Sequence, residues 1–252
     1  MKRLIKSIPV VGPFAVRLFR FLYYRLPTRY PGSPLARAAV RRTLALAVEY
    51  AYCGEVQGDL AEFGTMSGET AATLAEAMTE VEALYRWPAR RLHLFDSFQG
   101  LPEPTSSVDK DCVHVRSGTW SAGACMVLTK ERLEFKISRT LPRERFEIHP
   151  GWFKDTVKEI SLSQRFALLH LDCDLYESTL DALGPLFARG QVSEGAVLLF
   201  DDWNTNRASP QFGQRRAWAE LTTKHGIVFS DEGAYGVFGR KLIVLDYQRV
   251  GA

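Results

Sequence analysis

The sequence predicts an α/β fold with a doubly wound, mostly parallel β-sheet and an N-terminal helical arm. From residue 58 onward, short apolar runs alternate with segments of helical length. Two of these runs, at residues 165–174 and 195–203, are almost continuously apolar, which is typical of parallel strands buried on both faces. Strands that alternate with helices in this way are joined by right-handed crossovers into one sheet.

A helix predicted at residues 35–52 precedes the first strand and belongs to the N-terminal arm. GDLAEFG (58–64) is a short apolar run that ends in glycine, and it predicts the first strand, with a helix at 69–84 after it. RLHLFDS (91–97) predicts the second strand and RFEIHPG (145–151) the third.

The second half of the body continues the alternation. The two strongly apolar runs are its central strands, and a helical segment separates them. In chain order, we expect a short helix at 155–160, a strand at 165–174 (RFALLHLDCD), a helix at 177–189, a strand at 195–203 (GAVLLFDDW), a helix at 215–225, and closing strands at 227–230 (IVFS) and 241–245 (KLIVL).

Residues 102–123 interrupt the alternation of predicted strands and helices. They are rich in Ser, Thr, Pro, Gly and charged residues, and they form a longer stretch than ordinary connections between strands and helices. We interpret them as an active-site lid. The alternative is a disordered surface insertion.

The charge of the chain is uneven, although its net value is only +3 over 252 residues. Residues 1–48 contain ten basic residues and no Asp or Glu, whereas the remainder has 22 basic and 29 acidic residues. We therefore divide the chain into a basic arm at 1–52, with a short amphipathic helix at about 14–26, and a single-domain body at 53–252. Such an arm indicates an acidic partner, which could be anionic lipid, a phosphorylated substrate, nucleic acid or the body of a second subunit. The ten basic residues are Lys2, Arg3, Lys6, Arg17, Arg20, Arg25, Arg29, Arg37, Arg41 and Arg42.

The sequence favours a cytoplasmic protein. Arg17, Arg20 and Arg25 interrupt the apolar stretch of the arm, whereas a membrane span needs about 20 apolar residues. Pro9 and Pro13 likewise argue against a signal peptide. The four cysteines are scattered, without a CxxC pair that would suggest zinc or redox chemistry. Residues 1–30 remain a candidate for peripheral contact with the inner face of the membrane.

The first two strands end in residues that could bind a nucleoside. Gly64 and Gly68 permit a tight turn and the close approach of a ligand to the backbone before the next helix begins. Asp96 ends the second strand, where a carboxylate can accept hydrogen bonds from both hydroxyls of a ribose. The alternatives are a plain turn for the glycines and a helix cap for Asp96. Together, the two features favour an adenosine-containing cofactor.

Carboxylates also end the two central strands. Asp172, Asp201 and Asp202 are expected to converge at the carboxyl edge of the sheet, where open α/β sheets bind their ligands. Converging carboxylates repel one another unless a cation neutralises them. Ligation by oxygen alone indicates a hard metal ion, Mg²⁺ first, with Mn²⁺ or Ca²⁺ as alternatives. None of the five histidines stands in a metal-ligand spacing, so we expect core or surface roles for them.

Several motifs together resemble the macrocin O-methyltransferase-type family, which comprises class I methyltransferases that act on sugar hydroxyls. The resemblance extends over residues 58–245, with the motifs in the same order along the chain. The motifs are LAEFGTMSGET, LHLFDSFQGLPEP, HPGWFKDT, HLDCDLYESTLDAL and GAVLLFDDW. One departure is the turn GTMSGE, where the family usually has a GVWRGG-like sequence.

The resemblance implies a seven-stranded sheet, S-adenosyl-L-methionine as cofactor and Mg²⁺ bound by Asp172, Asp201 and Asp202. It implies Asp172 and Asp174 as catalytic carboxylates, with Asp174 as the general base. It implies a sugar-containing acceptor, no nucleic acid, and a homo-oligomer. The residues expected around the cofactor are Glu62, Gly64, Thr65, Met66, Gly68, Asp96, Ser97, Gly151 and Trp152.

Two other functions compete with methyl transfer. Asp172-Cys173-Asp174 is also a DxD motif, which in a metal-dependent glycosyltransferase binds a metal and a nucleotide sugar. In that case the glycine turn, Asp96 and the Asp201–Asp202 pair would have no role. A membrane- or partner-binding scaffold, in which only the basic arm functions, is the second alternative.

Overall fold

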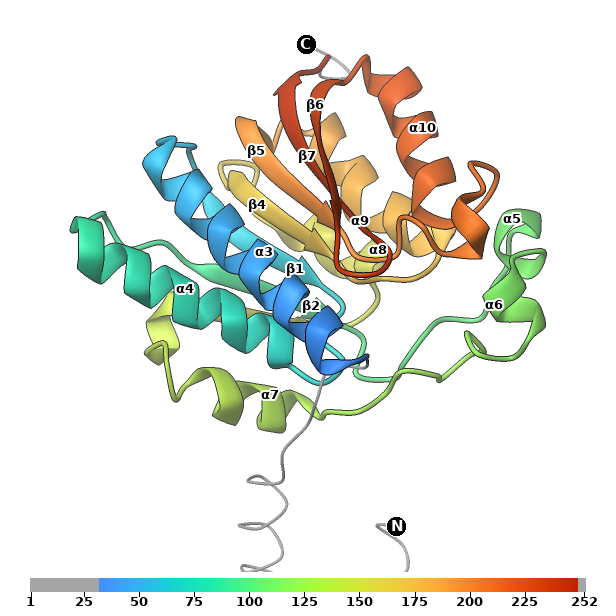
Figure 1. The fold of residues 1–252 in the computed structure, drawn as a ribbon, viewed down its shortest axis with the longest axis horizontal. Helices are drawn as coiled ribbons and strands as arrows, with labels where there is room; N and C mark the ends of the chain where they lie inside the picture. The colour runs from blue at the N-terminus through green and yellow to red at the C-terminus, as the bar shows by residue number, and fades with distance from the viewer. Residues whose placement is uncertain (1–31, 249–252) are drawn as a thin grey trace, which may run out of the picture.

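The computed structural model describes residues 32–248, and they form one seven-stranded sheet with helices on both faces (Figure 1). The strand order is β3-β2-β1-β4-β5-β7-β6, in which β7 runs antiparallel to its two neighbours and the other pairs are parallel. The strands are β1 (Asp59–Phe63), β2 (Leu92–Asp96), β3 (Phe146–Pro150), β4 (Phe166–Leu171), β5 (Val192–Phe200), β6 (Val228–Tyr235) and β7 (Gly239–Asp246). The predicted α/β class and the doubly wound sheet are confirmed.

Two apolar layers hold the helices to the sheet. The longer helices are α3 (Pro34–Cys53), α4 (Glu69–Tyr85), α7 (Lys130–Ile137), α9 (Tyr176–Ala188) and α10 (Gly213–His225). Side chains of α3, α4 and α7, among them Leu44, Met78 and Leu133, form one core cluster. The other face is covered by α9 and α10 through residues such as Phe187 and Trp218. The helix α3, expected as part of the arm, thus packs in the body.

The short elements lie mostly between β2 and β4. They are α5 (Ser107–Lys110), α6 (Val113–Arg116), α8 (Phe153–Thr156), and the 3₁₀ turns η1 (Arg143–Arg145), η2 (Val157–Glu159) and η3 (Asn206–Ala208).

The predicted elements within the described residues are all present, with their ends shifted by a few residues. Two segments were not predicted as helical. One is α7, and the other is the pair α5 and α6 inside residues 102–123. The pair is too short for helical periodicity to be visible, because each helix has four residues. The helix predicted at residues 14–26 lies outside the described part of the chain.

The order in which the strands are added to the sheet reverses between β1 and β4, which makes this position the topological switch point. The chain passes from β1 outward to β2 and β3, and then returns to the other side of β1 as β4. Ligands of open α/β sheets bind at the carboxyl ends of the strands beside such a point. Among residues 32–248, no helix is both long and apolar enough to cross a membrane.

Candidate active site

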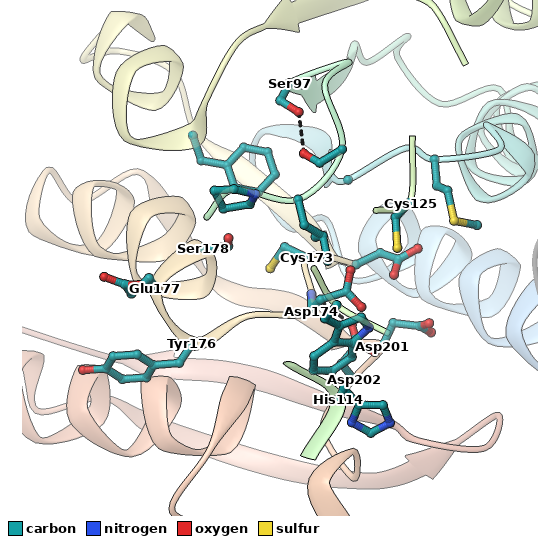
Figure 2. Close-up of a pocket in the computed structure, with 18 of the residues that line it drawn as sticks. Ser97, His114, Cys125, Cys173, Asp174, Tyr176, Glu177, Ser178, Asp201 and Asp202 are labelled. Atoms are coloured by element: carbon teal, nitrogen blue, oxygen red, sulfur yellow. Dashed lines mark hydrogen bonds between the residues drawn. The ribbon is translucent and has the colours of Figure 1, made fainter. Parts of the chain in front are cut away.

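A cavity of about 1370 Å³ opens at the carboxyl edge of the sheet (Figure 2). The loops that follow the five parallel strands β1 to β5 contribute to its wall, and so does the segment 102–123. Among the residues predicted for cofactor, metal and catalysis, those that line it are Gly64, Met66, Asp96, Ser97, Gly151, Trp152, Asp172, Asp174, Asp201 and Asp202.

The turn after β1 is packed against the loop after β4. Gly64 has a φ of +88°, and a Cβ atom built there would lie 1.9 Å from the carbonyl oxygen of Asp172. A side chain would push these two loops apart, so glycine is required both for its backbone conformation and for this close approach. The backbone amide of Asp172 donates to the Phe63 carbonyl at 2.9 Å, which fixes the start of the acid-bearing loop.

Asp96 is held in place by the turn after β1. Its Oδ2 accepts hydrogen bonds from the backbone amide and the hydroxyl of Thr65, both at 2.8 Å, and its Oδ1 accepts from the Phe98 amide at 2.7 Å. Each carboxylate oxygen can accept more than one hydrogen bond. The carboxylate therefore faces the cavity in a fixed orientation and retains acceptor capacity for a ligand.

Three predicted cofactor residues do not line the cavity. Thr65 orients Asp96, as described above. Gly68 begins α4 with a φ of +65°, and a Cβ atom there would meet Leu133 of α7 at 2.9 Å. Glu62 is completely buried in β1 and its Oε1 lies 2.9 Å from Nδ1 of His170, also completely buried. These three residues support the site from behind its wall.

Ser97 lies at the cavity but uses its hydroxyl within its own loop. The hydroxyl donates to the Gly100 carbonyl at 2.8 Å and accepts from the Gln99 amide at 3.0 Å (Figure 2). The Gly151 amide donates to the Asp96 carbonyl at 2.9 Å, so the Gly151–Trp152 turn lies beside the end of β2.

Four carboxylates line the cavity where β4 and β5 end. Asp201 and Asp202 are buried, while Asp172 and Asp174 are half-buried and open to the cavity. Burial and the neighbouring Asp202 raise the pKa of Asp172 to about 8, and burial and Asp172 raise the pKa of Asp174 to about 8. Burial raises the pKa of Asp201 to about 6, and burial with Asp174 and Asp201 raises the pKa of Asp202 well above its ordinary value.

A buried glutamine, Gln214, joins the two acid-bearing loops. Its side-chain amide donates to the Leu171 carbonyl at 2.8 Å, and its carbonyl oxygen accepts from the Asp202 amide at 2.9 Å. The Asp174 amide in turn donates to Oδ2 of Asp202 at 3.2 Å, and Asp174 has a φ of +59°. Sequence reasoning missed Gln214, because it lies in α10 and no local motif indicates that it reaches back to β4 and β5.

The segment 102–123 is ordered and forms part of the wall. Its ends are joined by hydrogen bonds from the Leu101 amide to the Ala124 carbonyl and from the Gly123 amide to the Leu101 carbonyl. Trp120 and Cys112 pack in a small core that they share with Leu175 of the loop after β4. The alternative of a disordered insertion is therefore excluded. The structure supports the interpretation that this segment covers the site.

Asp109 connects this segment by hydrogen bonds to α9, the helix that follows the loop carrying Asp172 and Asp174. Its buried carboxylate accepts hydrogen bonds from the Tyr176 and Glu177 amides at 2.8 and 3.0 Å, at the first turn of α9. Glu177 reciprocates by accepting from the Thr105 and Ser106 amides. These contacts satisfy free amides of the helix N-terminus and place a negative charge where the helix dipole favours it.

The fold and the carboxylate-lined cavity define a Rossmann-like α/β protein of the class I methyltransferase type. Residues 37–229 match the family model described as Macrocin-O-methyltransferase (TylF). This match extends over more than half of the chain, and the chain belongs to that family.

Individual relatives agree with this membership. The chain is 34% identical over 164 residues to 8-demethyl-8-(2,3-dimethoxy-alpha-L-rhamnosyl)-tetracenomycin-C 4'-O-methyltransferase of Streptomyces olivaceus, a match that covers 64% of this chain and 58% of the relative. It is 28% identical over 186 residues to mycinamicin III 3''-O-methyltransferase of Micromonospora griseorubida, a match that covers 73% of this chain and 67% of that relative. Among solved structures, the O-methyltransferase NovP is similar with a TM-score of 0.62 and 26% identity, covering 83% of this chain and 78% of NovP.

Proposed function

We propose that this protein transfers a methyl group from S-adenosyl-L-methionine to a hydroxyl of a sugar in a glycan or glycosylated natural product, with the help of a divalent metal ion. The observation that carries the proposal is the group of buried and half-buried carboxylates that shares one cavity with Asp96. The names of the two relatives, a 4'-O- and a 3''-O-methyltransferase, support a sugar hydroxyl as acceptor.

The charge of the cavity fits this cofactor. Eight Asp or Glu residues line the cavity, whereas Lys154 is the one Lys or Arg among the described lining residues. S-adenosylmethionine carries a positive sulfonium, which such a wall attracts. Asp96 is oriented to accept hydrogen bonds from the ribose hydroxyls, and Gly64, Met66, Ser97, Gly151 and Trp152 lie around the same space. We propose these as the cofactor-binding residues.

The same charge argues against the glycosyltransferase alternative. A nucleotide sugar brings a diphosphate, which needs cationic groups or free backbone amides at its binding site. The wall of this cavity is mainly anionic over the described residues. A single divalent ion would leave most of these carboxylates facing the diphosphate.

The carboxylates fit a divalent metal ion. Buried acids whose pKa values are raised by burial and by one another are costly to ionise together, and a cation removes that cost. Asp172, Asp201 and Asp202 would hold the ion, and their oxygen donors suit Mg²⁺, with Mn²⁺ or Ca²⁺ as alternatives. When bound, such an ion lowers the pKa of an acceptor hydroxyl and helps to fix its position.

The residues of the chain supply orientation and a proton acceptor. Asp174 is the proposed general base, because its carboxylate opens to the cavity beside the metal-binding acids (Figure 2). Asp172, in the same loop after β4, positions the acceptor. The segment 102–123 excludes water from the reacting groups. Orientation of the acceptor against the methyl group can contribute about 7–11 kcal/mol to catalysis.

Chelation tests the proposal directly. We expect excess EDTA to abolish methyl transfer to glycoside acceptors and Mg²⁺ to restore it, while isothermal titration shows nearly unchanged binding of S-adenosylmethionine. Full activity in protein shown to be free of metal would contradict the metal dependence. Binding of a nucleotide sugar in place of S-adenosylmethionine would favour the glycosyltransferase.

For residues 1–30 we propose peripheral contact with anionic membrane, which would keep the enzyme on the cytoplasmic side. The support is compositional, since seven of the ten basic residues of the arm fall among these residues and no acid does. Each Lys or Arg near an anionic surface contributes about 1 kcal/mol. Co-sedimentation with anionic vesicles at low salt tests this contact. If the full chain ignores the vesicles and deletion of residues 1–30 breaks a homo-oligomer, the arm has an assembly role instead.

A further inference from the structure

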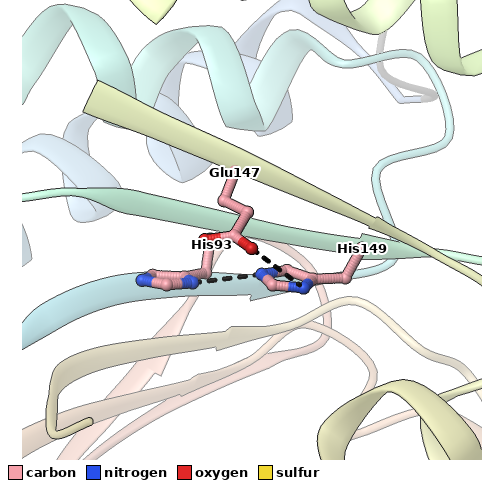
Figure 3. Close-up of side chains that lie close together, drawn as sticks. All are labelled: His93, Glu147 and His149. Carbon is pink, nitrogen blue, oxygen red and sulfur yellow. Dashed lines mark hydrogen bonds and ion pairs between the residues drawn. The ribbon is translucent and has the colours of Figure 1, made fainter. Parts of the chain in front are cut away.

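Three potential metal ligands lie together on β2 and β3, away from the carboxylate cluster (Figure 3). Glu147 and His149 are two residues apart on β3, so their side chains project from the same face of the sheet. The strand register pairs His93 of β2 with Glu147, which brings the third side chain to that face. The ligand atoms of the three residues all lie within 4.8 Å of one another.

The two imidazole rings are already at a spacing that suits one metal ion. Nδ1 of His93 lies 3.1 Å from Nε2 of His149. Two nitrogens on one tetrahedral zinc ion stand about 3.3–3.4 Å apart, since each Zn–N bond is about 2.0–2.1 Å long. A metal ion could therefore replace the hydrogen that these nitrogens share after a small movement of the rings.

Asp59 orients His93 for this role. Its Oδ2 lies 3.4 Å from Nε2 of His93, so a ring proton on Nε2 would be donated to this carboxylate and would leave the lone pair of Nδ1 facing His149. Asp59 is itself held by the Arg91 amide at 2.9 Å and by the side-chain amide of Gln164 at 2.9 Å. A carboxylate that receives the second N–H of a ligating histidine is a common outer-shell arrangement at metal sites.

Packing holds the ring of His149 in a position that suits ligation. The ring stacks on Phe95 with centroids 4.3 Å apart, which restricts its movement. Its Nδ1 lies 4.0 Å from Oε1 of Glu147 and would carry the ring proton when Nε2 binds a metal ion, so Glu147 would have to turn from Nδ1 toward Nε2 to complete the ligand set.

We propose that His93, His149 and Glu147 form a second metal site, which binds a borderline transition-metal ion such as Zn²⁺. This inference goes beyond the proposed methyl transfer and does not depend on it. Two imidazole nitrogens and one carboxylate are a ligand set typical of zinc, whereas Mg²⁺ prefers oxygen ligands alone. A metal ion there would tie the edge strand β3 to β2, next to the strand ends that carry Asp96 and Gly151.

Cobalt and zinc titrations test this site in the full chain after removal of any affinity tag. Co²⁺ reports its ligand geometry by visible absorption, and Zn²⁺ affinity is measured by isothermal titration after EDTA treatment and dialysis. The protein for both titrations carries Asp202→Asn, so that the carboxylate cluster is weakened. The variants are His149→Gln and Glu147→Gln, with His114→Gln as the matched control. His114 lies in α6, outside the cluster.

We expect one Zn²⁺ per chain in the Asp202→Asn protein, with intense visible bands for tetrahedral Co²⁺. His149→Gln should weaken Zn²⁺ binding at least tenfold and remove these bands, while His114→Gln leaves both unchanged. Equal zinc affinity in the His149→Gln and His114→Gln proteins would overturn the proposal, and so would the absence of stoichiometric binding. If His149→Gln lowers the melting temperature, its weaker zinc binding could reflect misfolding. The Glu147→Gln variant then decides the test: Glu147 lies on the edge strand, so this variant should fold and should still bind zinc more weakly.

Discussion

Two clusters of potential metal ligands share one sheet, but they differ in chemistry and in how the fold assembles them. The carboxylate cluster, Asp172, Asp174, Asp201 and Asp202, lies in loops beyond the ends of β4 and β5. The histidine cluster, His93, Glu147 and His149, lies within β2 and β3. The first offers only oxygen donors and opens to a large cavity, whereas the second offers nitrogen donors and packs among aromatic rings.

The difference leads us to propose separate roles for the two clusters, catalysis for the carboxylates and metal binding alone for the histidines. Carboxylates in loops beyond the strand ends can face a substrate, because the backbone there is not held by the hydrogen bonds between strands. Histidines inside strands are fixed by the register and are covered by neighbouring rings. We therefore expect turnover to depend on the carboxylate cluster. The histidine cluster should affect metal content and the stability of β3.

The largest expected effect distinguishes the two clusters by turnover. Asp202→Asn removes one carboxylate from the proposed Mg²⁺ site, and methyl transfer should fall by more than the roughly 10–100-fold seen when only outer-shell groups are lost. Zinc uptake by the histidine cluster should persist. Steady-state rates at several Mg²⁺ concentrations give the measurement, with the exposed Glu80→Gln as control. Equal rates for the two variants would mean that the carboxylates are not the catalytic site.

A second prediction uses β2, which carries a residue of each site. Asp96→Ala should weaken S-adenosylmethionine binding by about 1.5–3 kcal/mol, the scale of hydrogen bonds to a charged group. His93 is three residues away, and its metal binding should not change. Isothermal titration with the cofactor and with Zn²⁺ checks both halves. An unchanged cofactor affinity would show that Asp96 serves only to hold Thr65 and Phe98.

Gln214 provides a smaller effect that is confined to the carboxylate cluster. Gln214→Met keeps the approximate volume of the side chain but leaves the Leu171 carbonyl and the Asp202 amide without their partner. Activity should fall by about 10–100-fold, the range for outer-shell residues. The Mg²⁺ concentration needed for half-maximal activity should rise. A fall in melting temperature without any change in Mg²⁺ dependence would assign Gln214 a purely structural role.

The smallest expected effect is a pH dependence of stability that belongs to the histidine cluster. The pKa of His149 is lowered to about 4, mainly by burial and His93, with Glu147 opposing and Arg91 adding to the shift. The unfolded chain, with an ordinary histidine pKa near 6.5, therefore binds more protons between about pH 6.5 and 4. Metal-free protein should lose stability as the pH falls through this window.

His149→Gln removes this contribution, so its melting temperature should fall less steeply than that of the wild type between about pH 6.5 and 4. Thermal melts in EDTA at half-unit steps give the two curves. His114→Gln serves as the control and should follow the wild type. Parallel curves for His149→Gln and the wild type would show that His149 titrates normally in the folded protein.

The sequence by itself predicted the fold class and the approach of several acidic residues to one edge of the sheet. Apolar runs and glycine turns are local signals, and they placed β1 to β5 within a few residues. The rule that parallel strands present their carboxyl ends at one edge then brought Asp96, Asp172, Asp201 and Asp202 to one cavity. The motifs also predicted the family, which the match over residues 37–229 confirms.

Tertiary structure decided what local patterns cannot encode. Glu62 was expected at the cofactor, but it pairs with His170 of the neighbouring strand. The expectation of plain core or surface roles for the histidines did not foresee that His93 and His149 lie together. They are 56 residues apart in the chain, and only the register of β2 with β3 brings their ring nitrogens to 3.1 Å. Strand register depends on the packing of the whole sheet, so a spacing along the chain does not reveal such a pair.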